Sequence, residues 1–219
     1  MKKSILKKLT AIAACASIGI STLSSISFSA SADYENPILP ENVEDYVDIN
    51  QSAFVSNVTH YYQSGGQSWS SDYCGGSSSN PTIANAGCAI TSFAMILGHY
   101  GLSANPGQVN STLGSSAYPF QWYTAASVYG LSSPTITTFS NTYAQKALAH
   151  STICSYVRND IPVIVGLKNS SGNTHFVVAR GAAPQNAYIY IYDPSYNTDN
   201  TVLSQYTNNG YYVYEIIVY

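Results

Sequence analysis

Residues 163–179 read VIVGLKNSSGNTHFVVA, and this stretch decides the fold class. Two apolar, β-branched runs flank a polar segment whose Ser, Gly and Asn residues are typical of a turn. A link this short joins antiparallel strands, because a parallel pair needs a crossover of about a dozen residues or more. The stretch therefore predicts a β-hairpin, with one strand over 163–167 and the next over 175–179.

The segments on either side of this hairpin predict the remaining elements. Further strands are expected at 187–192 and 211–218, where β-branched and aromatic residues gather, and a short strand is expected at 54–59. Apolar residues at one-face helical spacing predict a buried helix over 89–100, closed by Gly101. The other helix candidates are 119–129 and 141–158, and the Ser- and Gly-rich stretch 64–80 is a predicted loop. Helices followed by strands indicate an α+β domain.

Charge is scarce in this chain. Only 9% of its 219 residues are charged, and 8 basic against 11 acidic residues give a net charge of −3. Four of the basic residues are lysines within the first eight positions, which leaves 4 basic and 11 acidic residues, or −7, for the remainder. Binding to nucleic acid needs clustered Lys and Arg, so the composition argues against a nucleic-acid partner and against an anionic membrane surface.

Residues 1–32 have the order of a secretory signal peptide. The lysines come first, an uncharged apolar stretch follows over 9–28, and Ala30-Ser31-Ala32 offers small residues for cleavage before Asp33. We expect a secreted protein without membrane contact after cleavage. Two alternatives stay open: a transmembrane anchor, which the serines and threonines of the stretch disfavour, and lipidation at Cys15, since Ile12-Ala13-Ala14-Cys15 resembles a lipobox.

Three cysteines follow the predicted cleavage site, and Cys88 is the candidate nucleophile. It comes directly after Gly87 and begins a predicted helix, where the positive end of the helix dipole favours a thiolate. A buried structural thiol is the alternative. Because three is an odd number, a Cys74–Cys154 disulfide that leaves Cys88 free also stays open. The cysteine spacing and the scattered histidines do not match a zinc site.

A thiolate nucleophile usually works with a histidine, and the sequence has four. His60 is expected at the surface of a strand or loop, and His150 on the exposed side of a helix. His99 lies eleven residues after Cys88 on the same predicted helix, which is about 16 Å along the axis and out of reach. His175 opens an apolar strand directly after a polar turn, so it is the best candidate base.

The third member of such a site orients the histidine through its other ring nitrogen. Asp193 ends the strand after the one that His175 begins. If these two strands form a hairpin, His175 and Asp193 lie side by side at the same end of it. The alternative is that Asp193-Pro194 serves only as a turn.

Several motifs, in this order, resemble the double-glycine-leader (bacteriocin-processing) cysteine peptidase family of the papain-like clan, in its stand-alone branch. They are Gln63 followed by Trp69, the nucleophile helix AGCAITSFAMIL at 86–97, the strand DIPVIV at 160–165, the histidine strand HFVVARG at 175–181, and YIYDP at 190–194. The family usually has Gly-Pro after the cysteine, whereas this chain has Ala89-Ile90.

This resemblance implies a papain-like α+β fold, with helices packed on an antiparallel sheet, over residues 61–219 after an N-terminal arm at 33–60. It assigns Cys88 as nucleophile, His175 as base, Asp193 as its orienting group, and the Gln63 amide as part of the oxyanion hole, with Gln67 as an alternative to Gln63. It implies a peptide or protein substrate and no metal or organic cofactor.

The sequence thus predicts a secreted cysteine peptidase with a Cys-His-Asp triad. Two other functions remain open at this point. One is a catalytically silent extracellular binding module on the same scaffold, which the Tyr- and Ser-rich composition would suit. The other is a papain-like cell-wall amidase or endopeptidase.

Overall fold

The computed structural model describes residues 48–195 and 201–219. The chain divides into two units, Met1–Glu44 and Asp45–Tyr219, and all described residues belong to the second. The predicted signal peptide, the alternative lipidation site Cys15 and the first part of the predicted arm lie outside the described residues.

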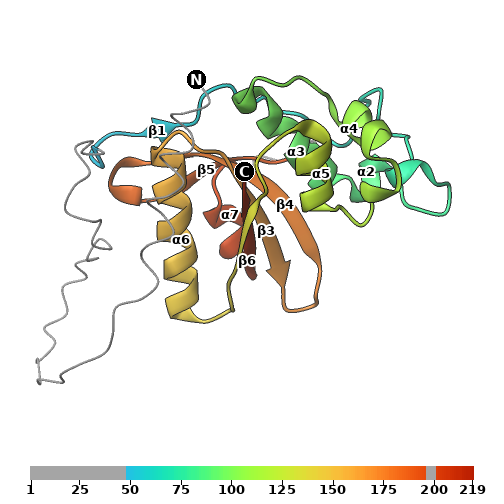
Figure 1. The fold of residues 1–219 in the computed structure, drawn as a ribbon. Helices are drawn as coiled ribbons and strands as arrows, with labels where there is room; N and C mark the ends of the chain where they lie inside the picture. The colour runs from blue at the N-terminus through green and yellow to red at the C-terminus, as the bar shows by residue number, and fades with distance from the viewer. Residues whose placement is uncertain (1–47, 196–200) are drawn as a thin grey trace, which may run out of the picture. The chain divides into compact units, whose positions relative to one another are not determined.

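An antiparallel sheet of six strands forms the centre of the described unit (Figure 1). The predicted hairpin is confirmed, because β3 pairs with β4 in a register that sets Val165 opposite Val177. The strand order is β1-β4-β3-β6-β2, and β5 pairs with β4. The strands are β1 (Ala53–Phe54), β2 (Thr135–Thr138), β3 (Val163–Asn169), β4 (Thr174–Ala182), β5 (Ile189–Tyr192) and β6 (Tyr211–Val218).

Helices cover both faces of this sheet. In Figure 1, α6 stands on one side of strands β3, β4 and β6, and α3 and α5 stand on the other. Since alternate residues of a strand point to opposite faces, β3 contributes Val163, Val165 and Leu167 to the core under α6 and Ile164 to the core around α3. The helices are α2 (Ile83–Ala86), α3 (Cys88–Ile96), α4 (Pro106–Leu113), α5 (Trp122–Tyr129), α6 (Tyr143–Arg158) and α7 (Ser204–Thr207). Short 3₁₀ turns lie at η1 (Cys74–Gly76), η2 (Leu97–Tyr100), η3 (Gly114–Ser116) and η4 (Pro184–Asn186).

The α+β class and most element positions agree with the sequence analysis. The helix expected over 89–100 is α3 continued by η2, and Gly101 ends it with a φ of 74°, in the left-handed region that glycine adopts without strain. Strand β6 has the predicted bounds, 211–218. Helices α5 and α6 begin three and two residues later than the starts predicted at 119 and 141.

The strand expected at 54–59 is wrong beyond Phe54. Asn57 turns the chain with a φ of 56°, and its carbonyl oxygen packs against Gly98 so closely that a Cβ there would lie 2.5 Å from it. The Thr59 N–H then donates to the Met95 carbonyl at 3.0 Å. The segment leaves β4 at this point because its hydrogen bonds go to the end of α3.

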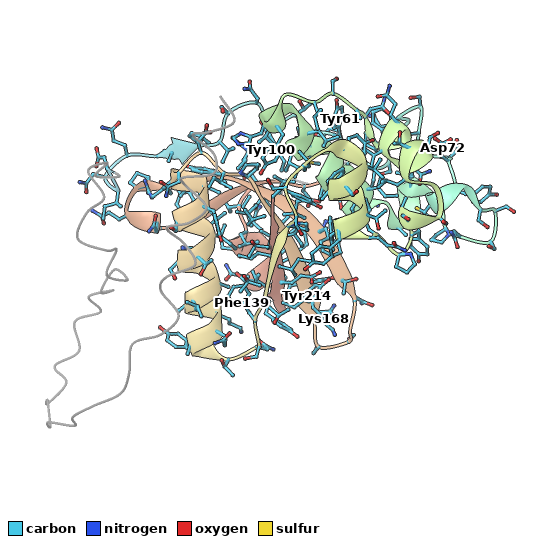
Figure 2. All side chains as sticks on the ribbon, in the orientation of Figure 1. Tyr61, Asp72, Tyr100, Phe139, Lys168 and Tyr214 are labelled. Atoms are coloured by element: carbon cyan, nitrogen blue, oxygen red, sulfur yellow. The ribbon has the colours of Figure 1, made fainter. Side chains whose placement is uncertain are left out.

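Helix α4 and strand β2 were not expected from the sequence. Helix α4 begins with a capping box, in which the Gln108 N–H donates to Asn105 Oδ1 and the Asn105 N–H donates to Gln108 Oε1, both at 2.9 Å. The Asn-Pro-Gly-Gln sequence carries this start signal. Strand β2 lies beyond β6, and the Phe139 N–H after it donates to the Tyr214 carbonyl at 2.9 Å; Figure 2 labels these two residues beside each other.

The Cys74–Cys154 disulfide is not present. Both thiols are free and buried, Cys74 in the core around α3 and Cys154 in the core under α6. The sheet lies between the two cores, so its faces keep the sulfur atoms apart. None of the helices within residues 48–195 and 201–219 is long and apolar enough to cross a membrane.

Residues 48–56, at the end of the predicted arm, are fastened to the body of the unit by polar contacts. Arg158, at the end of α6, donates from Nη1 to the carbonyls of Asp48 (3.2 Å) and Gln51 (3.1 Å). The Ser56 N–H and hydroxyl both donate to the Asp160 carboxylate, at 2.7 and 3.0 Å. These contacts set the path by which the chain reaches residues 60–63.

Candidate active site

Cys88 is the first residue of α3, and its side chain is half-buried. The N–H groups of a helix's first turn have no partner within the helix, so they face outward at this end. Gly87 is required by close packing: a Cβ on it would lie 2.5 Å from both the Cγ2 and the carbonyl oxygen of Ile83. The space that a side chain at position 87 would need is thus occupied by the short helix α2. The absence of a side chain at Gly87 allows α2 to pack directly against the start of α3.

His175 is the second residue of β4 and lies opposite Leu167 of β3. Its Nε2 is 2.9 Å from Asp193 Oδ1. Because an ionised carboxylate only accepts hydrogen bonds, Nε2 carries the hydrogen and donates it. The Cys88 thiol lies close enough to His175 to raise the pKa of its imidazole, and Nδ1 is the ring nitrogen that does not face Asp193. The structure thus brings Cys88, His175 and Asp193 together.

The pKa values of this group follow from its contacts. Burial of the His175 ring disfavours its charged form, but the hydrogen bonds and negative charges of Asp193 and Cys88 outweigh this and raise the pKa of His175 to about 9. Burial likewise opposes ionisation of Asp193, yet its contacts with His175, Tyr206 and Ser195 lower its pKa to about 2. At neutral pH the pair is therefore an imidazolium and a carboxylate.

Asp193 follows β5 and has only 2% of its side chain exposed. Besides His175, its Oδ1 accepts the Ser195 N–H at 2.8 Å, and its Oδ2 accepts the Tyr206 hydroxyl at 2.6 Å. Tyr206, on α7, also packs its ring against that of His175, with 5.3 Å between centroids. Sequence reasoning missed Tyr206, because nothing in its local pattern separates it from the chain's other 19 tyrosines.

Gln63 is buried close to the same group. Its backbone N–H donates to the Pro194 carbonyl at 2.8 Å, and its side-chain Nε2 donates to the Ala84 carbonyl of α2 at 2.8 Å. An amide nitrogen has two hydrogens, so Nε2 keeps a second donor. The alternative, Gln67, begins the turn in which its carbonyl accepts the Ser70 N–H at 3.0 Å. Of the two glutamines, Gln63 is the one with a contact to the Asp193-Pro194 loop.

The other three histidines each bond a backbone carbonyl, and two of them are less exposed than expected. His60 is half-buried, and its Nε2 lies 2.7 Å from the Asp193 carbonyl oxygen. His150 is also half-buried, because its Nε2 bonds the Asn186 carbonyl at 2.7 Å. His99 lies in η2, beyond the far end of α3, where its Nδ1 is 3.1 Å from the Ser56 carbonyl, so it is out of reach as expected.

A hollow of about 500 Å³ lies next to α4, away from this group. Its lining includes Trp69, Asp72 (labelled in Figure 2), Gln108 and Tyr129, and none of Cys88, His175 and Asp193. Trp69 connects it to the Gln63 segment, because the Trp69 indole N–H donates to the Tyr62 carbonyl at 2.8 Å. Within residues 48–195 and 201–219, no group of three or more His, Cys, Asp or Glu side chains could hold a metal ion.

A search of curated proteins returned no match for this chain. A comparison with protein-family models did return one, that of the Peptidase_C39 like family, over residues 55–218. That range covers most of the chain and includes Gln63, Cys88, His175 and Asp193, together with all strands but β1. The chain therefore belongs to the Peptidase_C39 like family.

Proposed function

We propose that this protein is a cysteine peptidase that hydrolyses peptide bonds with a Cys88-His175-Asp193 triad. Family membership implies a peptide substrate, and the helices on an antiparallel sheet are consistent with the papain-like fold of the family. The observation that carries the proposal is the position of one imidazole: His175 bonds Asp193 through Nε2, and it lies close enough to the Cys88 thiol at the start of α3 for the two groups to interact electrostatically.

In the first step, the Cys88 thiolate attacks the carbonyl carbon of the scissile peptide bond and forms a C–S bond. The Cys88 backbone N–H and the second hydrogen of Gln63 Nε2 are the donors proposed for the developing oxyanion. The His175 imidazolium then gives its Nδ1 proton to the leaving nitrogen as the C–N bond breaks. The products of this step are a free amine and a thioester on Cys88.

In the second step, water attacks the thioester carbonyl while neutral His175 accepts its proton at Nδ1. The C–S bond breaks, a carboxylic acid leaves, and the Cys88–His175 pair is restored. Asp193 accepts a hydrogen bond from His175 Nε2, which leaves Nδ1 for the reaction at Cys88 and stabilises the imidazolium. Each of the three side chains thus has a separate task.

Secretion is part of the same proposal, and it rests on the amino-acid order of residues 1–32. Mass spectrometry of the protein recovered from the culture medium should find an N-terminus at Asp33. An N-terminal lipid on Cys15 in the membrane fraction would replace this proposal with the lipoprotein alternative.

The nucleophile is tested first by alkylation, which needs no substrate. Burial raises the pKa of Cys74 to about 11 and that of Cys154 to about 12, so both are protonated and slow to react at neutral pH. Iodoacetamide at pH 7 should therefore modify Cys88 well ahead of the other two, as peptide mass mapping would measure. Equal rates for all three thiols in the folded protein would contradict the assignment.

The peptidase activity itself is tested on a fluorogenic peptide library. Cys88→Ala should lower turnover of any cleaved peptide by about a thousandfold or more, because it removes the nucleophile. The control is Cys154→Ala, which removes a buried thiol from the other core and leaves the site intact. Cleavage that persists in Cys88→Ala would show that the reaction does not use this thiol.

A further inference from the structure

His60 contacts two adjacent residues, Tyr192 and Asp193, of which Asp193 is the acidic member of the candidate triad. Its Nε2 lies 2.7 Å from the carbonyl oxygen of Asp193, and its ring stacks on Tyr192, with 4.4 Å between centroids and 15° between planes. Tyr192 and Asp193 are adjacent in sequence, whereas His60 is 133 residues away from Asp193. His60 therefore contacts the backbone of the residue that carries the carboxylate, at the point where β5 ends.

The protonation of His60 follows from this geometry. A backbone carbonyl only accepts hydrogen bonds, so the His60 hydrogen must sit on Nε2. Burial of the ring lowers the pKa of His60, against the opposing effects of the Asp193 carbonyl and charge, and the Arg180 cation also disfavours a second positive charge. Neutral His60 with Nε2–H is thus the form present at neutral pH, and it is a donor of fixed orientation.

A second contact comes from the same segment. Three residues after His60, the Gln63 N–H donates to the Pro194 carbonyl at 2.8 Å. Residues 60–63 therefore bond two consecutive carbonyls of the Asp193-Pro194 loop. A shift of the Asp193-Pro194 loop would therefore also move the segment that contains Gln63. The positions of Asp193 and of the Gln63 amide, the candidate oxyanion donor, are coupled in this way.

We propose that His60 is a positioning residue of the active site, which holds the Asp193 carboxylate on His175 through the Asp193 backbone carbonyl. A role of His60 in catalysis rests on the peptidase function proposed above. Only the Cα–Cβ and Cβ–Cγ bonds separate the Asp193 backbone from its carboxylate, so a displaced carbonyl displaces Oδ1 from Nε2. Displacements of about 1 Å in such groups cost about a hundredfold in rate.

The test uses His60→Phe, which keeps a ring on Tyr192 and removes the donor, and His60→Gln, whose Nε2 restores a donor. The matched control is His150→Phe, because His150 bonds a backbone carbonyl at the same 2.7 Å distance, on Asn186 of η4. The readout is the titration midpoint of His175, followed by NMR. We expect His60→Phe to lower that midpoint by about one pH unit and His60→Gln and His150→Phe to change it by less than about half a unit.

A purely structural role for His60 would lower the thermal stability of His60→Phe and His150→Phe alike and leave the His175 midpoint in place, which would overturn the proposal. Equal shifts in both phenylalanine variants would overturn it as well. If His60→Phe does not fold, ¹⁵N NMR of the unaltered protein decides: a hydrogen on His60 Nδ1 contradicts the donor geometry, and one on Nε2 supports it. A protein without peptidase activity would refute the proposed function and leave this titration result intact.

Discussion

At the scale of single residues, contacts converge on Asp193. Its two carboxylate oxygens and its carbonyl oxygen accept hydrogen bonds from His175, Ser195, Tyr206 and His60. Charged acceptors form the stronger class of hydrogen bond, and a buried carboxylate needs such partners to stay ionised. The position of this residue thus depends on its own loop, which contains Ser195, and on three other segments of the chain.

Tyr206→Phe should lower peptidase turnover by about tenfold, because it removes one donor from a charged, buried acceptor. The phenylalanine ring keeps its place against His175. The loss should appear in kcat rather than KM, and the pKa of Asp193 should rise from about 2. Steady-state kinetics and an NMR titration of the carboxyl measure the two effects.

The control for this change is Tyr143→Phe, since Tyr143 has 82% of its surface exposed and lies at the start of α6. It should leave both quantities unchanged. An unaltered Asp193 pKa in Tyr206→Phe would show that the phenol does not support the ionised carboxylate.

At the scale of elements, the join between α2 and α3 sets the position of the nucleophile. Helix α3 is buried along its length after Cys88, with Ala89 to Ile96 all inside the core. A helix held this way cannot rotate to relieve a bad contact at its start. Because Ile83 packs so closely against Gly87, a larger residue at position 87 would displace the backbone of the neighbouring Cys88.

Gly87→Ala should destabilise the fold by about 2 kcal/mol, because its Cβ would lie 2.5 Å from the Ile83 carbonyl and the backbone must move. Thermal unfolding measures the loss. The rate of Cys88 alkylation should fall in the same variant, since the thiol shifts from His175.

Gly66→Ala is the matched control, because a Cβ there meets nothing within 4 Å and adds only the strain of its φ of 79°. Its cost should be about 1 kcal/mol, with no change in alkylation. Equal behaviour of the two alanine variants would mean that the overlap with Ile83 is relieved without moving the helix.

At the scale of the whole described unit, the sheet separates two hydrophobic cores. The candidate site contains residues from elements on both faces of the sheet. Cys88 comes from a helix packed on one face, whereas Tyr206 packs against the core of the other. His175 and Asp193 lie at the end of the strands between them. Folding of the unit and assembly of the site are therefore one event.

The stability of the unit should accordingly depend on pH through the His175–Asp193 pair. The pKa of Asp193 is lowered from 3.8 to about 2, so its contribution is present above 3.8 and is lost as the pH falls through about 2. The pKa of His175 is raised from 6.5 to about 9, so its contribution is complete below 6.5 and is lost as the pH rises through about 9. The full contribution of the pair thus lies between pH 3.8 and 6.5.

Asp193→Asn should reduce the free energy of unfolding by about 2 kcal/mol within that window, and by less at higher pH as His175 titrates. Denaturant titrations of both proteins at pH 5 and at pH 10 measure the difference. A difference that does not change with pH would show that the ion pair adds no stability of its own.

Much of the fold follows from local sequence. The hairpin at 163–179, β6, α3 and α6 were predicted because residue periodicity and turn residues act over short distances. Helix α4 was missed although the sequence contains its capping-box residues. Strand β2 was missed because a four-residue strand at the sheet edge is too short to show a clear alternation of apolar and polar residues. The pairing of His175 with Asp193 was also foreseeable, since antiparallel strands bring their facing ends together.

The sequence by itself thus determined the α+β class, the family resemblance, and Cys88, His175 and Asp193 as the candidates for chemistry. Only the tertiary structure decided that Cys74 and Cys154 lie in different cores, and that His60 and Tyr206 hold Asp193. These contacts join residues far apart in the chain, as with the 133 positions between His60 and Asp193. No local periodicity encodes such a contact, because it exists only after the sheet and its helices have packed.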